Sequence, residues 1–159
     1  MDAKWFSQAR HIKTLTSLDL SGTRISDLKG LSGLTNLIEL DLSFTRVSDL
    51  SELADLTQLA FLNLYGTRVS DLSALKRLTN LIELDLRETQ VSNVSPLAGL
   101  SNLNSLCLTE RPRCDVSPLE GFADSQIDVV SIDGYSWRTS DFSDDLTASA
   151  DSDLEEENI

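Results

Sequence analysis

The chain has 159 residues, a net charge of −13 and a pI of about 4.3. This balance argues against nucleic acid and anionic membranes as partners and favours a protein with a neutral or basic surface. Residues 1–13 contain no signal-like apolar run, no stretch approaches a membrane span, and two cysteines make a poor disulfide framework. We therefore expect a cytoplasmic monomer with reduced thiols; the alternative is an effector secreted without a cleavable signal peptide.

Residues 1–14 are expected to form an N-terminal half-repeat. Phe6, Ala9 and Ile12 precede three leucines of the next segment by 22 residues each. This spacing predicts a short amphipathic helix that covers the first coil with Trp5 or Phe6.

Residues 15–132 carry a leucine ladder. The pattern Leu-x-x-Leu-x-Leu begins at residue 15 and returns at residues 37, 59, 81 and 103, each time after 22 residues. A fixed period of this size predicts a solenoid of stacked supersecondary units. The alternation of apolar and polar residues inside the pattern predicts one short, half-buried strand in each repeat.

The second half of each repeat is apolar at every third residue, which suits a 3₁₀ turn better than a long α-helix. A residue able to accept hydrogen bonds from the free N–H groups of this turn comes just before it in each repeat. These predicted caps are Asp27, Asp49, Asp71, Asn93 and Asp115.

The 22-residue frame, with the recurring Ser-Asp-Leu-Ser of residues 48–51 and 70–73, resembles the bacterial, internalin-like class of the leucine-rich repeat family over about Ala3 to Ile132. The resemblance implies an α/β-type solenoid: a right-handed superhelix with a parallel, concave β-sheet of about six short strands and a 3₁₀ or irregular convex side. The family usually places Asn where the strand turns. Here the position holds threonine, at Thr23, Thr45, Thr67 and Thr89.

The array is expected to deform at its fifth coil, where Arg111 replaces the threonine and Arg113 the adjacent aliphatic residue. After a two-residue insertion, Ile127, Val130 and Ile132 repeat the strand pattern. These residues predict a sixth strand.

The sequence after the repeats divides into two parts. Residues 133–138 are expected to form a C-terminal cap in which Tyr135 and Trp137 cover the edge of the last strand. Residues 139–159 contain eight carboxylates and no Lys or Arg, which predicts an acidic, disordered tail.

With the leucines inside, the polar positions of the strands fall into columns on the concave sheet. The columns gather the scarce aromatic residues at the centre and surround them with carboxylates, a layout typical of an interface hot spot. The alternative is that these aromatic residues and carboxylates are ordinary surface residues without a binding role. The candidate partner-binding residues are Glu39, Asp41, Phe44, Phe61, Asn63, Tyr65, Glu83, Asp85 and Arg87.

A further column holds Arg24, Arg46 and Arg68, each three residues before an aspartate. We expect local Arg–Asp pairing along this edge. The alternative is a contact strip for an acidic partner.

Neither a metal site nor a catalytic site is predicted, and no cofactor. Calcium could attract stacked carboxylates, but Asn63 interrupts their column and no Asp-x-Asp-x-Asp-Gly loop is present. His11 is the single histidine and lies far along the chain from Cys107 and Cys114, so no nucleophile–base pair can be assembled.

The sequence as a whole predicts a bacterial, non-catalytic protein-interaction module. One alternative is an inhibitor or immunity-like protein that occludes a basic enzyme. Another is a structural repeat segment of a larger protein.

Overall fold

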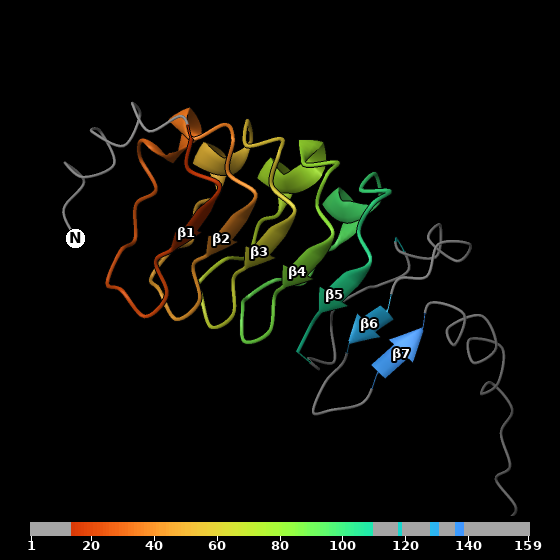
Figure 1. Cartoon of the computed structure of the whole chain (residues 1–159). Coiled ribbons are helices and arrows are strands. Elements are labelled where there is room, and N and C mark those ends of the chain that lie inside the picture. Colours follow the sequence, from red (N-terminus) through yellow and green to blue (C-terminus); the bar gives the residue numbers. More distant parts are fainter. Residues whose placement is uncertain (1–13, 110–117, 119–127, 131–135, 139–159) are drawn as a thin grey trace, which may run out of the picture.

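A computed structural model describes residues 14–109, 118, 128–130 and 136–138. In this part of the chain, successive coils each contribute one short strand, and the first four strands are each followed by a 3₁₀ turn (Figure 1). The strands are β1 (Ser17–Asp19), β2 (Glu39–Asp41), β3 (Phe61–Asn63), β4 (Glu83–Asp85), β5 (Ser105–Cys107), β6 (Asp128–Val130) and β7 (Ser136–Arg138). The 3₁₀ turns are η1 (Leu31–Gly33), η2 (Ser51–Leu53), η3 (Ser73–Arg77) and η4 (Ser95–Leu97).

All strands belong to one sheet in the order β1 to β7 (Figure 1). Strands β1 to β6 are parallel, and β1 to β5 pair exactly one 22-residue period apart, as Leu40 opposite Leu62 and Leu62 opposite Leu84 illustrate. The predicted parallel sheet with 3₁₀ turns is confirmed. The right-handed winding remains a prediction.

The predicted register of the sixth strand is wrong by one residue. Val129, not Val130, lies opposite Leu106, so the insertion before β6 has one residue instead of two. Because Val129 and Val130 are both apolar, the pattern alone does not tell which one takes the interior position, and a slip of one residue exchanges the two faces of a strand. Strand β7 pairs antiparallel with β6, with Trp137 opposite Val129, and so occupies the edge that β6 would otherwise leave free.

Several predictions fall outside the described residues. They are the N-terminal helix, the deformation at Arg111 and Arg113, the thiol of Cys114 and the acidic tail.

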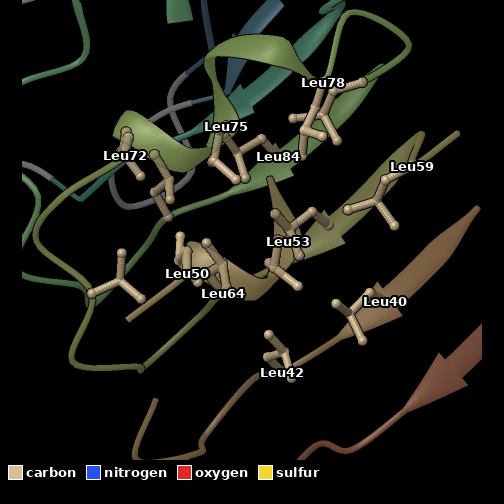
Figure 2. Close-up of a cluster of buried hydrophobic side chains, with 14 of the residues drawn as sticks. Leu40, Leu42, Leu50, Leu53, Leu59, Leu64, Leu72, Leu75, Leu78 and Leu84 are labelled. Atoms are coloured by element: carbon tan, nitrogen blue, oxygen red, sulfur yellow. The ribbon is translucent and has the colours of Figure 1, made fainter. Parts of the chain in front are cut away.

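The core is the interior of the leucine ladder. Leucines from the strands meet leucines from the 3₁₀ turns of the same and neighbouring coils (Figure 2). Leu53 and Leu75 from the turns and Leu64 from the sheet side are fully buried. Each coil therefore depends on its neighbours to cover its apolar side, which makes the stack one folding unit.

The threonines at the strand-to-turn position bond within their own coil. The hydroxyl of Thr45 donates to the carbonyl oxygen of Leu42 at 2.7 Å, and the equivalent threonines of the first, third and fourth coils repeat this bond. Side-chain amides link the coils at a different position, just before the strand. Asn80 Nδ2 donates to the carbonyl of Thr57 and Asn102 Nδ2 to that of Thr79, each at 2.8 Å.

The predicted hydrogen bonds from the 3₁₀ turns are confirmed in three repeats, because Asp71 and Asn93 accept the N–H of the first residue of η3 and η4, and Oδ1 of Asp49 accepts that of Ser51 at 2.8 Å. Asp27 instead accepts the N–H of Lys29, two residues before η1, and Asp115 lies outside the described residues. Asp49 stands one residue before the N-cap residue, Leu50. These contacts are thus Asx turns that lead the chain into the 3₁₀ segment.

Candidate protein-binding surface

The exposed positions of β1 to β5 line a groove of about 530 Å³. We call this surface the concave face. The parallel register fixes its columns, because Glu39, Phe61 and Glu83 are direct neighbours across β2, β3 and β4. Adjacent strands lie about 4.8 Å apart, so side chains of one column are close enough to contact the same ligand.

Phe61 occupies the middle of the groove. It is half-buried, and the exposed carboxylates of Glu39 and Glu83 stand on either side of it. Glu39 Oε2 accepts a hydrogen bond from the hydroxyl of Ser17 at 3.1 Å. The centre of the groove therefore offers an apolar ring between two negative charges.

The next column has a structural role that the sequence analysis missed. Oδ1 of Asp41 accepts the backbone N–H of Ser43 at 2.7 Å, and Asp19, Asn63 and Asp85 accept the N–H two residues ahead in the same way. Asn63 Nδ2 also donates to Asp41 Oδ2 at 3.0 Å. An Asp or Asn two residues before the turn in four repeats was the available signal. These side chains end the strands as well as facing the groove.

A second cluster lies where the strands end, and we call Phe44 and Tyr65 the rim aromatic pair. Their ring centroids are 4.7 Å apart with an interplanar angle of 82°, an edge-to-face contact. Arg87 Cζ lies 5.3 Å from the centroid of Tyr65. Arg87 is held there by Asp85 through Nε–Oδ1 and Nη2–Oδ2 contacts of 3.1 and 2.6 Å, and this hydrogen bonding raises the pKa of Arg87.

The three aromatic residues thus form two sites instead of the single predicted cluster. Phe61 makes no ring contact with Phe44 or Tyr65 within the described residues. The groove contains Phe61, and the rim contains the aromatic pair.

Phe44 has an unusual backbone conformation. Its φ is +56°, in the left-handed region, at a position where the first and third coils have Gly22 and Gly66. Its side chain is 62% exposed. A Cβ on Gly66 would lie 3.1 Å from Phe44 Cδ1, so this glycine leaves space for the ring. A bulky, exposed side chain on a strained backbone is a feature that clusters at functional sites.

Two exposed isoleucines at the other end of the strands were missed from sequence. Ile38 and Ile82 are 39% and 37% exposed, and Ala60 lies between them in the same position of the intervening coil. The column was visible in the repeats as apolar residues immediately before Glu39, Phe61 and Glu83.

The predicted Arg–Asp pairing is wrong. Arg24, Arg46 and Arg68 are exposed, and within the described residues none of them forms an ion pair with an aspartate. The aspartates instead use Oδ1 to accept backbone N–H groups, and Asp27 also pairs with Lys29 at 3.0 Å. Hydrogen bonding to the N–H and ammonium of Lys29 lowers the pKa of Asp27.

The described surface carries one cysteine, Cys107, and several Asp and Glu side chains. In this part of the chain, no group of three or more His, Cys, Asp and Glu side chains is placed to hold a metal ion. Cys107 lies half-buried in the groove, where burial and then the nearby charge of Asp85 raise the pKa of its thiol. The thiolate is therefore disfavoured at neutral pH.

Comparison with known proteins agrees with this geometry. The family model for leucine-rich repeats in two copies matches residues 13–55 and 35–77. The structure of internalin C2 from Listeria monocytogenes is similar, with 37% identity and a TM-score of 0.66 over 71% of this chain. The chain is an internalin-like leucine-rich-repeat protein.

Other structures share the solenoid. The leucine-rich-repeat chain matches the internalin inlF from L. monocytogenes with 27% identity and a TM-score of 0.59 over 77% of its length. A leucine-rich-repeat protein of Leptospira interrogans is 25% identical over 65% of the chain, with a TM-score of 0.62. The chain spans 50%, 47% and 28% of the lengths of these three structures. The search of curated proteins gave no match.

Leucine-rich-repeat proteins of the internalin type commonly serve as protein-interaction modules, and the fold is generally a non-catalytic scaffold. Among the described residues there is no helix with the length and apolarity needed to cross a membrane.

Proposed function

We propose that this protein is a non-catalytic interaction module that binds a partner protein with a neutral or basic surface across its concave face and rim. The observation that carries the proposal is Phe44, which exposes a large ring from a strained backbone and packs against Tyr65. The ring contacts Tyr65 edge to face and lies over Gly66 without any partner bound. Preorganised aromatic anchors of this kind supply much of the binding energy of protein interfaces.

The charges of the groove support the nature of the partner. Glu39 and Glu83 flank Phe61, so a Lys or Arg side chain of the partner would meet an aromatic face and two carboxylates together. The binding residues we propose are those of the groove and rim together: Glu39, Asp41, Phe44, Phe61, Asn63, Tyr65, Glu83, Asp85 and Arg87.

The test begins with affinity capture of a partner and continues with calorimetry on the purified pair. The double variant Phe61→Ala, Tyr65→Ala should weaken binding by at least tenfold, because truncating a single hot-spot residue typically costs about 2 kcal/mol or more. The matched control is Lys76→Ala, Thr79→Ala, which truncates two exposed residues on and just after η3, away from the groove. Equal affinities of all three proteins would refute the proposal.

The acidic groove also favours a second candidate, an inhibitor or immunity-like protein that covers the active site of a basic enzyme. A tight one-to-one complex that abolishes the activity of a captured enzyme would support the inhibitor. Retained enzyme activity in the saturated complex would support the non-inhibitory interaction module instead.

A further inference from the structure

The three arginines after the threonines of the strand-to-turn position form a row on one edge of the solenoid, which we call the arginine ladder (Arg24, Arg46 and Arg68). The backbone holds them in line, because the N–H of Arg46 donates to the carbonyl of Ile25 and that of Arg68 to the carbonyl of Val47, each at 2.9 Å. Neighbouring coils are about 4.8 Å apart at the sheet. The ladder is therefore a row of guanidinium groups on three successive coils.

The ladder is not neutralised by the protein's own side chains in the described region. Arg77 and Arg87 have carboxylate partners at 3.5 and 2.6 Å, whereas the ladder arginines have none. This is notable in a chain with 26 acidic and 13 basic residues. The nearby Asp27, Asp49 and Asp71 each use Oδ1 to accept a backbone N–H in an Asx turn, and none of them pairs with a ladder arginine in the described region.

We propose that the arginine ladder is a second contact surface, which binds an extended, carboxylate-rich segment of a partner protein. The planar guanidinium group donates two parallel hydrogen bonds to a carboxylate, so a row of three favours a segment with repeated Asp or Glu. Side chains on one face of an extended segment recur about every 6.6 Å, a spacing that flexible arginines can match.

Two features define the extent and the setting of this surface. Gln90 takes the equivalent position in the fourth coil, so the row of charge ends after three coils. Arg46 follows Phe44 by two residues, which places the ladder beside the rim aromatic pair. A partner anchored on the rim could thus continue along the ladder. The overall charge of −13 disfavours nucleic acid as the polyanion.

The test is fluorescence anisotropy with a labelled peptide of alternating Glu and Ser, at low and at physiological ionic strength. The triple variant Arg24→Gln, Arg46→Gln, Arg68→Gln should lose about tenfold in affinity, as expected for three exposed charge pairs. The control Lys29→Gln, Lys76→Gln, Arg77→Gln removes the same charge outside the ladder and should change affinity by less than about twofold. Affinity for the wild type should fall as salt rises.

Three results would overturn the proposal. The first is no binding of the peptide to the wild type, or an equal loss in both triple variants. The second is equal or tighter binding of a single-stranded oligonucleotide, which would assign the ladder to nucleic acid. The third is peptide binding only in a full-length variant whose eight acidic residues in 139–159 are changed to Asn or Gln, which would assign the ladder to the chain's own C-terminal sequence. The peptide assay needs no captured partner and its variants change no groove or rim residue, so its outcome is independent of the proposal for the concave face.

Discussion

Replacing Phe44 by glycine and, separately, by alanine separates the strain at this residue from the contacts of its ring. Both variants remove the ring that packs over Gly66 and against Tyr65. Only glycine relaxes at a φ of +56°. We therefore expect the glycine variant to be the more stable of the two, the reverse of the usual order in regular structure.

The difference in unfolding free energy between the glycine and the alanine variant results from two opposing effects. A left-handed backbone costs a non-glycine residue roughly 1–2 kcal/mol. The greater conformational freedom of glycine stabilises the unfolded chain and offsets about 0.4–1 kcal/mol of the strain that glycine relieves. Phe44→Gly should then exceed Phe44→Ala in unfolding free energy by about 1 kcal/mol. Both variants also lose the edge-to-face contact, which contributes about 0.5–1.5 kcal/mol. The unfolding free energy of the glycine variant should therefore be close to that of the wild type, and that of the alanine variant should be lower.

Urea denaturation followed by circular dichroism measures these free energies. Glu88 provides the matched control, because its φ is +55° and it contributes no aromatic ring. Glu88→Gly should likewise be more stable than Glu88→Ala. If glycine is favoured at residue 88 but alanine is equal or better at residue 44, Phe44 is not strained and the argument from its conformation fails.

Three further predictions concern single contacts. Asn80→Ala should lower the unfolding free energy measured in urea by about 1 kcal/mol, because it removes the 2.8 Å hydrogen bond to the carbonyl of Thr57. Gln58→Ala, at the equivalent position of the preceding coil, should have little effect. Equal losses in the two variants would show that the hydrogen bond of Asn80 does not stabilise the stack. Hydrogen bonds from the hydroxyl and N–H of Ser73 lower the pKa of Asp71, so its ionised form stabilises the fold above pH 4 and this contribution is lost as the pH falls further. Asp71→Asn should therefore show a smaller drop in Tm between pH 5 and pH 2.5 than the wild type. An equal drop in both proteins would show that the ionised carboxylate of Asp71 does not stabilise the fold. In a protein with Cys114 changed to Ser, Cys107 should react with iodoacetamide at pH 7.5 more slowly than free cysteine does, because burial raises the pKa of its thiol. Asp85→Asn should speed this reaction by removing a nearby negative charge. A rate equal to that of free cysteine would show that burial does not raise the pKa of Cys107.

The sequence was most predictive where one residue type had a single function. Each ladder leucine must be inside, so positions such as Leu40, Leu62 and Leu84 determined both the core and the register of the first five strands. The prediction failed at β6 because Val129 and Val130 satisfy either face equally well.

The candidate site was harder to predict because it depends on backbone conformation and on competition for hydrogen bonds. Phe44 has a left-handed φ and contacts Tyr65 in the rim pair, which the spacing of the leucines alone does not predict. The glycines at positions 22 and 66 were the indirect signal. Similarly, the three-residue spacing from Arg46 to Asp49 suggested an ion pair, but the carboxylate of Asp49 accepts the backbone N–H of Ser51 instead.

Site-specific photocrosslinking tests the central claim, partner binding on the concave face, most directly. A photoreactive benzoylphenylalanine at position 61, in the middle of the groove, should crosslink to the captured partner on irradiation. The same residue at position 76, in η3, should not. Crosslinking from position 76 with none from position 61 would contradict the account.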